Sequence, residues 1–325
     1  MSFFHLYNDN IMKKLLFLCL FMFGMMNVYA IHPLVSELDS MFVSGELFPL
    51  IEQVKQLRAD PSDLSEVDKS IAYTYELLAS YEMGIPVDLA KKQEALKYSE
   101  QAFGPESRNY ALALIPSDTY DKSTYNDIEK AIGLLKTSCG ESSWEYAYAQ
   151  ARKVGCMMML GKSREGIGQS GQAIALFEKY GYGKGWMCAK GYSMRACLKV
   201  MNRDGSCFED MEKAIDITNA MGDQGLCPSV EIFAHSVFVC TNSGMFAEAI
   251  KMGTDLMSIM DTLKLQGTVS YAANMQNLAI AYYMNGEKQK ALDGLSACKK
   301  IYESLNMTGD TRYRQVISSI KDINK

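Results

Sequence analysis

Residues that could take part in catalysis are few in this chain of 325 residues. Beyond residue 30 there are two histidines, His32 and His235. No serine or cysteine lies in a sequence pattern typical of an activated nucleophile. His235 falls in the middle of a predicted helix, where a structural histidine is expected. We therefore expect no catalytic residue and predict that the protein is not an enzyme.

The sequence also contains no pattern typical of a cofactor or metal site. Residues 181–185 read Gly-Tyr-Gly-Lys-Gly, but no strand precedes them and no Gly-Lys-Ser/Thr ending follows, as a phosphate-binding loop requires. A turn between two helices is the better interpretation. The cysteines and histidines lack zinc-site spacing, and the acidic residues lack calcium-loop spacing. We expect no cofactor and no metal.

The elements that must position any binding site repeat along the chain. The triplet Lys/Glu/Gln-Ala-Ile/Leu recurs at spacings of 36, 42, 41, 35 and 42 residues, counted between its alanines Ala95, Ala131, Ala173, Ala214, Ala249 and Ala291. A second series recurs at 36, 43, 42, 42 and 42 residues, and consists of Gly104, Gly140, Gly183, Gly225, Gly267 and Gly309. Two markers with one period predict stacked copies of a helical pair.

The last repeat resembles the tetratricopeptide repeat (TPR). Small residues at Ala279 and Ala291 let the two helices of a pair approach closely, and Tyr282 fills the gap beside them. The other residues that carry the resemblance are Tyr271, Ala272, Met275, Leu278, Gly286, Leu295 and Cys298. The period of 42 rather than 34 is similar to the longer-helix variety of kinesin light chains and many bacterial proteins. The resemblance implies an all-α, right-handed α-solenoid of about six antiparallel helix pairs.

The early repeats differ from the late ones. Eleven residues separate Gly84 from Ala95 and twelve separate Gly161 from Ala173, whereas five separate the corresponding residues of the last two pairs. The longer turns that this spacing predicts resemble those of Sel-like repeats, a related family. In the second repeat the first helix, over residues 109–115, is expected to be short because Pro116 follows it.

The resemblance implies that the first helices of the pairs line a concave groove, through their second, fifth, ninth, twelfth and thirteenth positions. In the last two pairs these positions include Glu231, Ala234 and Ala273. The residues that we expect to bind a partner are Phe238, Thr241, Asn242, Gln276, Ile280, Tyr283 and Met284. Aromatic and aliphatic anchors edged by amides suit an extended or helical peptide. The alternative is that some of them pack against the N-terminal segment or a second copy of the chain.

Eight cysteines lie beyond residue 30, and their positions within the repeats indicate that most of them are small core residues. Cys156, Cys197 and Cys240 recur at nearly the same position of successive first helices. Packed helix axes are about 8–10 Å apart, whereas a disulfide needs Cα atoms within about 7 Å. Cys188 and Cys227 are the one pair whose positions favour a disulfide. In residues 157–159, three consecutive methionines, at least one side chain must leave the core.

The N-terminal residues have the features of an export signal. Lys13 and Lys14 precede an apolar run of 12 residues, 15–26, and a cleavage site follows at Ala30. Twelve residues are too few to span a membrane, which takes about 20. Leu18 stands before Cys19, where a lipoprotein signal needs a small residue, so no lipid anchor is expected. An exported protein that is periplasmic or extracellular is predicted, with translation starting at Met1 or Met12.

These features divide the chain into a signal peptide (1–30), an N-terminal helical segment (31–62), the repeat array (63–305) and a C-terminal capping helix (306–325). Without residues 1–30 the chain has 31 basic and 37 acidic residues, a net charge of −6, and no basic cluster for nucleic acid. The predicted function is a non-catalytic scaffold that binds a peptide or protein. The alternatives are an all-α enzyme acting on an envelope or polysaccharide substrate, which would need converging carboxylates, or a structural subunit of an envelope complex.

Overall fold

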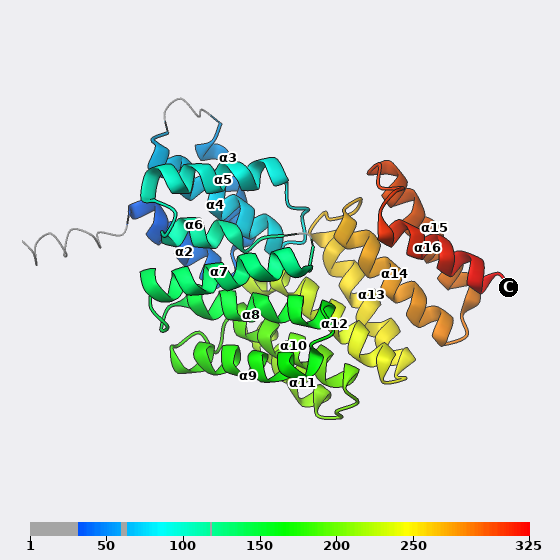
Figure 1. Cartoon of the computed structure of the whole chain (residues 1–325). Helices are drawn as coiled ribbons and strands as arrows, with labels where there is room; N and C mark the ends of the chain where they lie inside the picture. The colour runs from blue at the N-terminus through cyan, green and yellow to red at the C-terminus, as the bar shows by residue number, and fades with distance from the viewer. Residues whose placement is uncertain (1–31, 60–63, 118) are drawn as a thin grey trace, which may run out of the picture. The chain divides into compact units, whose positions relative to one another are not determined.

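The structure is a computed structural model that describes residues 32–59, 64–117 and 119–325 (Figure 1). Its described residues belong to two compact units, one ending at Asp39 and one covering Ser40–Lys325. The export signal and Cys19 lie outside the described residues. Within those residues every regular element is helical, so the all-α class is confirmed.

Six helix pairs make up most of the second unit (Figure 1). They are α4 (Glu66–Glu82) with α5 (Leu89–Phe103), α6 (Arg108–Leu114) with α7 (Lys122–Ser138), α8 (Trp144–Met159) with α9 (Ser163–Lys179), α10 (Trp186–Met201) with α11 (Cys207–Ala220), α12 (Leu226–Asn242) with α13 (Phe246–Thr262), and α14 (Val269–Met284) with α15 (Lys288–Ser304). The short α6 is confirmed to within one residue.

The remaining elements flank the pairs or join them. They are α2 (Pro33–Ser44), α3 (Leu47–Leu57), the 3-10 turn η3 (Gly222–Gly225) and α16 (Thr311–Ile323). Helices α2 and α3 lie within the N-terminal helical segment expected at residues 31–62, and α16 lies within residues 306–325, where a capping helix is expected. Helix α2 is the first described helix of that N-terminal segment. Its last residues pack into the array, because the buried ring of Phe42 contacts Trp144, Tyr148 and Trp186.

Side-chain caps explain why several first helices begin where they do. The Ser143 hydroxyl accepts a hydrogen bond from the Tyr146 backbone N–H at 3.2 Å, and Thr268 does the same for Tyr271 at 3.1 Å. Each satisfies an amide that the first helical turn leaves without a partner, which stabilises a helix by about 1 kcal/mol. Gly140 and Gly267 each precede a Tyr-Ala pair, at residues 146–147 and 271–272. Each pair lies in the first turn of a helix, with the capping residue three positions before the tyrosine.

All six marker alanines are fully buried on second helices. They do not occupy one position, because Ala249 and Ala291 are the fourth residues of their helices and Ala173 is the eleventh of α9. The long turn expected after Gly161 is wrong, since α9 begins at Ser163. The extra residues lengthen the helix before the triplet. The long connection expected in the first pair is present, over residues 83–88, and the second pair also has a long one, over residues 115–121.

The cysteines are mostly core residues, as expected. Seven of the eight are buried, and Cys139 is partly exposed. Cys188 and Cys227, the pair that favoured a disulfide, are free thiols. Burial raises the pKa of both thiols to about 12, so they remain protonated and unreactive near neutral pH. In the methionine run Met157 is buried and Met159 is exposed.

Candidate functional site

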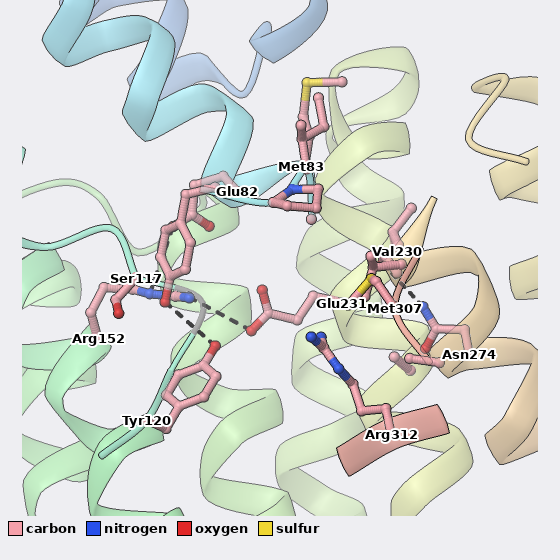
Figure 2. A pocket seen from close by; sticks show the side chains of 18 residues that line it. Glu82, Met83, Ser117, Tyr120, Arg152, Val230, Glu231, Asn274, Met307 and Arg312 are labelled. Atoms are coloured by element: carbon pink, nitrogen blue, oxygen red, sulfur yellow. Dashed lines mark hydrogen bonds and ion pairs between the residues drawn. The ribbon is translucent and has the colours of Figure 1, made fainter. Parts of the chain in front are cut away.

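A cavity of about 340 Å³ lies inside the unit Ser40–Lys325 (Figure 2). Its walls come from the end of α4 and the turn after it, the α6–α7 connection, α8, the N-terminal halves of α12 and α14, the α15–α16 connection and the start of α16. The residues that line it include Met83, Gly84, Ile85, Pro86, Tyr120, Arg152, Val230, Glu231, Val269, Ser270, Ala273, Met307 and Arg312. The cavity therefore combines residues of pairs that are far apart in the sequence.

The turn after α4 closes one side of the cavity against α14. Gly84 has φ +69°, a left-handed conformation that glycine adopts without steric cost. A Cβ atom at this position would lie 2.8 Å from the Ser270 hydroxyl oxygen. The first pair and the sixth pair thus meet at a contact that leaves no room for a side chain.

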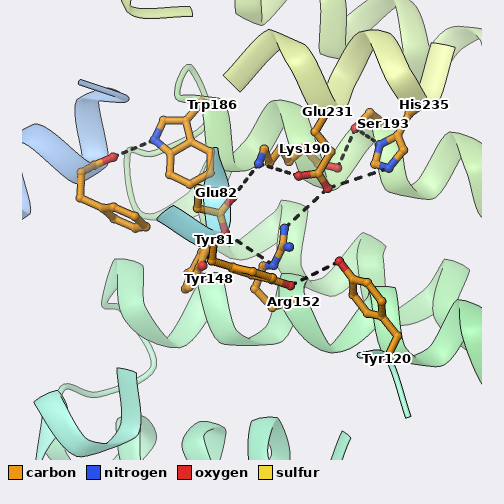
Figure 3. Close-up of polar contacts among 11 residues, drawn as sticks. Tyr81, Glu82, Tyr120, Tyr148, Arg152, Trp186, Lys190, Ser193, Glu231 and His235 are labelled. Carbon is orange, nitrogen blue, oxygen red and sulfur yellow. Dashed lines mark hydrogen bonds and ion pairs between the residues drawn. The ribbon is translucent and has the colours of Figure 1, made fainter. Parts of the chain in front are cut away.

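A buried network of charges lies at the base of the cavity (Figure 3). The carboxylate of Glu82, the last residue of α4, is completely buried. It accepts hydrogen bonds from Lys190 Nζ at 2.6 Å and from the Tyr148 hydroxyl at 2.5 Å. These partners stand on α8 and α10, so the network joins the first pair to the third and fourth.

Glu231 on α12 is the second carboxylate of the network. Lys190 Nζ lies 2.6 Å from it, and Arg152 Nη1 lies 3.6 Å from it. Burial alone raises the pKa of this carboxyl, but the charges of Lys190 and Arg152 outweigh burial and leave the pKa well below its usual range. Glu231 is therefore ionised in the folded protein, and it faces the cavity (Figure 2).

Among the charged groups of this network, Arg152 makes the longest contacts to the carboxylates. Its side chain is 9% exposed, and its closest carboxylate oxygens, on Glu82 and Glu231, both lie 3.6 Å away. Its Nε–H has no acceptor among the described residues. The guanidinium stacks over the Tyr81 ring, 4.5 Å from its centroid, and the Tyr81 hydroxyl lies 3.4 Å from that of Tyr120. Arg152 is thus held in place mainly by stacking and charge.

Ser193, His235 and Glu231 lie in an order similar to that of a catalytic triad (Figure 3). The Ser193 hydroxyl lies 2.9 Å from His235 Nδ1, but His235 Nε2 lies 3.9 Å from Glu231, beyond hydrogen-bond distance. Ser193 is 0% exposed and donates to the Lys190 carbonyl oxygen at 3.0 Å. A substrate has no access to this hydroxyl. The geometry matches the structural histidine that the sequence predicts.

The residues expected to bind a partner lie on the same two helices as the cavity wall but do not line the cavity. Tyr283 and Met284 are 44% and 52% exposed at the end of α14. Asn242 is exposed, and its side chain donates to the Phe238 carbonyl oxygen at 2.8 Å. The partly buried ones are Phe238, Thr241, Gln276 and Ile280. Their role in binding stays a prediction.

Three of the groove positions nearer the helix starts do line the cavity. They are Glu231, Ala234 and Ala273. Sequence reasoning missed the other charged residues, Glu82, Arg152 and Lys190. One signal was available, since Lys190 stands 42 residues after Tyr148 at an inward position of the next first helix. A charge at a core position needs a partner, which predicts a buried ion pair.

Two general features of the described residues bear on the site. None of their helices has both the length and the apolar character needed to cross a membrane. In the same residues, no three histidine, cysteine or acidic side chains gather where they could hold a metal ion.

Comparison with known proteins shows the fold. The chain matches no protein-family model, and no curated protein matches it. A signal-transduction ATPase of the STAND class with a tetratricopeptide repeat sensor, from Pyrococcus horikoshii, is similar over 85% of this chain and 42% of its own, with a TM-score of 0.53 and 13% identity. A protein from Podosopora anserina described as a kinesin light chain with nearly identical TPR-like repeats covers 67% of this chain and 96% of its own, with a TM-score of 0.40 and 15% identity. The fold is an all-α solenoid of the TPR type.

Proposed function

We propose that this chain is an exported, non-catalytic scaffold that binds a peptide segment of a partner protein. Folds of this type commonly serve as protein-interaction scaffolds. The observation that carries the proposal is the cavity of about 340 Å³, which has apolar walls and a buried guanidinium with unused donors. Concave sites with a few fixed polar groups among apolar ones are typical binding sites.

The peptide would extend from the cavity along α12 and α14. Phe238, Ile280, Tyr283 and Met284 stand on these two helices, C-terminal to the residues that line the cavity. Their aromatic and aliphatic side chains would then contact the part of the peptide outside the cavity. In this arrangement the cavity anchors one residue and these side chains support its neighbours.

The enzyme alternative requires a carboxylic acid that keeps its proton near neutral pH. Glu82 and Glu231 do converge, both within 2.6 Å of Lys190. However, the neighbouring cations depress the pKa of Glu231. The Glu82 side chain is completely buried, so a substrate has no access to its carboxyl group. This arrangement favours a structural ion pair over a general acid.

Binding is tested by panning a random peptide phage library against the purified chain. We expect enriched peptides to lose binding to the variant Ala273→Trp, which fills the cavity. The matched control is Ala247→Trp, because Ala247 is exposed on α13 and does not line the cavity. Phe238→Ala and Tyr283→Ala should weaken binding less than the cavity variant does. Enriched peptides that bind both tryptophan variants equally well would contradict the assignment of the cavity.

Export is tested separately by N-terminal sequencing of the protein recovered outside the cytoplasm. We expect the mature chain to begin at Ile31, directly after the proposed cleavage site. A protein that keeps residues 1–30 and stays in the cytoplasm would contradict export without affecting the peptide-binding proposal.

A further inference from the structure

The charged groups around the cavity balance one another. Arg152 and Lys190 carry two positive charges, and Glu82 and Glu231 carry two negative ones. Arg312, which also lines the cavity, is bound by the Asp310 carboxylate at 3.0 Å. His235 adds no charge near neutral pH, because burial lowers its pKa. An entering group with a unit charge would therefore leave one buried charge without compensation, which is unfavourable.

The same groups have hydrogen-bonding capacity left over. Within the described residues Arg152 lies no closer than 3.6 Å to a carboxylate: its buried Nε–H has no acceptor there, and its Nη1 lies 3.6 Å from the Glu231 carboxylate that lines the cavity. Glu231 faces the cavity with 27% of its side chain exposed, and each of its oxygens can accept more than one hydrogen bond. A donor and an acceptor thus stand next to each other at the cavity surface.

One uncharged group satisfies both at once. An amide has a carbonyl oxygen, which accepts from Arg152, and an N–H, which donates to Glu231. Hydrogen bonds to charged partners are stronger than those between neutral groups. An ester has the acceptor without the donor, and a carboxylate or an ammonium ion would upset the charge balance.

The rest of the cavity wall determines which chemical group next to the amide can bind. Met83, Ile85 and Pro86 line the cavity from the turn after α4, and Val230, Val269 and Met307 line it from the other elements. These side chains are aliphatic or thioether groups. They suit a branched aliphatic side chain next to the amide.

We propose that the cavity recognises an uncharged amide with an adjoining aliphatic group, and that Arg152 and Glu231 bind its carbonyl oxygen and its N–H. The inference rests on the proposed peptide-binding function and specifies its ligand. The amide is either a peptide-backbone amide next to an aliphatic residue or the primary amide of an asparagine or glutamine side chain. Both have the same donor and acceptor, and small probes separate them.

The experiment uses the full chain labelled with ¹³C at its methionine methyl groups. Met83 and Met307 line the cavity, whereas Met159 and Met201 are exposed and do not line it. The probes are N-acetyl-leucine N-methylamide, its isostere with both N–H groups replaced by ester oxygens, N-acetyl-leucine as the anion, leucine N-methylamide as the cation, and 4-methylpentanamide as a primary amide. Titration gives an affinity for each probe from the shifts of the Met83 and Met307 signals.

We expect N-acetyl-leucine N-methylamide or 4-methylpentanamide to shift the two cavity signals and leave Met159 and Met201 unchanged. Whichever of the two binds more tightly identifies the source of the amide. The diester, the anion and the cation should each bind at least about tenfold more weakly than the better amide. Ala273→Trp, which leaves the charge network intact, should abolish the shifts.

A charge change provides an independent test. Glu231→Gln removes one negative charge and should make the N-acetyl-leucine anion the tightest probe, a reversal that loss of folding does not produce. An anion or cation that binds the unaltered protein best, a diester equal to the amide, or the absence of any shift at Met83 and Met307 would overturn the inference. The proposed function fails only if library panning also yields no peptide that depends on the cavity.

Discussion

Glu82 is the residue that joins the most distant parts of the network. Its buried carboxylate is bound by groups of α8 and α10, and it ends the helix whose turn forms one wall of the cavity. An ionised group in such a place is tolerated only because its charge is compensated. Its removal leaves Lys190 and Arg152 with one anion in place of two.

The substitution Glu82→Gln is therefore expected to lower the free energy of unfolding by about 3–5 kcal/mol, the usual cost of breaking a buried pair. Denaturant unfolding followed by circular dichroism measures it. Glu52→Gln is the control, because Glu52 pairs with Lys55 at a surface position where both side chains are mostly exposed, and it should leave the midpoint nearly unchanged. Equal midpoints for the two variants would show that the network does not stabilise the fold.

His235 is expected to make stability depend on pH near neutrality. Burial lowers its pKa in the folded state, although Glu231 opposes this effect. The unfolded chain, with a histidine pKa of about 6.5, takes up the proton first, so stability falls as the pH decreases through that value. The loss should approach about 1.4 kcal/mol per pH unit for this one group.

Thermal unfolding midpoints measured between pH 7.5 and pH 5 check this dependence. The variant His235→Gln should have a shallower decrease than the unaltered protein. Above about pH 7.5 the two curves should run parallel, since neither state then carries a protonated histidine. Identical slopes across the whole range would assign the pH dependence to other groups.

At the scale of elements, the turn after α4 determines whether the cavity is closed. It is longer than the turns within the last four pairs, and it places Met83, Ile85 and Pro86 on the cavity wall. Its glycine combines a left-handed φ with a close approach to α14. Most other left-handed glycines of the array, such as Gly286, have open space where a Cβ would lie.

This difference provides a matched pair of variants. Gly286→Ala should cost about 1–2 kcal/mol from its φ of +86° alone. Gly84→Ala should cost more, because its Cβ would also lie 2.8 Å from the Ser270 hydroxyl, and it should increase amide hydrogen exchange in the first turn of α14. Adding Ser270→Gly removes the side chain that the new Cβ would meet, and should therefore abolish the extra cost of Gly84→Ala over Gly286→Ala. If Gly84→Ala costs no more than Gly286→Ala, the contact between the turn and α14 is not tight.

For the unit Ser40–Lys325 as a whole, the contacts between distant pairs set it apart from a simple repeat array. In such an array each pair touches only its neighbours, and unfolding can proceed piece by piece. Here Lys190 binds Glu82, 108 residues away, and the Trp186 indole donates to the Phe42 carbonyl oxygen, 144 residues away, at 2.8 Å. These contacts should make α4, α10 and α12 unfold together.

Hydrogen exchange at increasing denaturant concentration tests this cooperativity. In the unaltered protein, peptides from α4 and α12 should lose protection at the same concentration. Lys190→Met, which keeps the apolar stem but removes the charge, should separate the two transitions. Lys290→Met is the control because Lys290 is mostly exposed and its ion pair is with Glu287, three residues earlier. Separate transitions in the unaltered protein would contradict the expected coupling.

The sequence by itself determined what depends on local order. Helical periodicity and the recurring alanine and glycine markers act within one or two adjacent helices, and the six pairs were predicted from them. The caps at Ser143 and Thr268, found in the structure, act at the same local scale. The short α6 was predicted for the same reason, because the proline after it acts on its own helix. The triplet identified the buried face of each second helix but not its position along the helix, which led to the wrong turn before α9.

Only the tertiary structure decided the site. Glu82, Arg152, Lys190 and Glu231 stand on four different helices, and whether they meet depends on how successive pairs stack on one another. That geometry results from side-chain packing summed over several interfaces, and no short stretch of sequence contains it. The same applies to Gly84, whose contact with Ser270 brings the first pair against the sixth. The period along the chain therefore predicted the helix pairs, whereas the cavity between distant pairs and its balanced charges arise only when the pairs are packed.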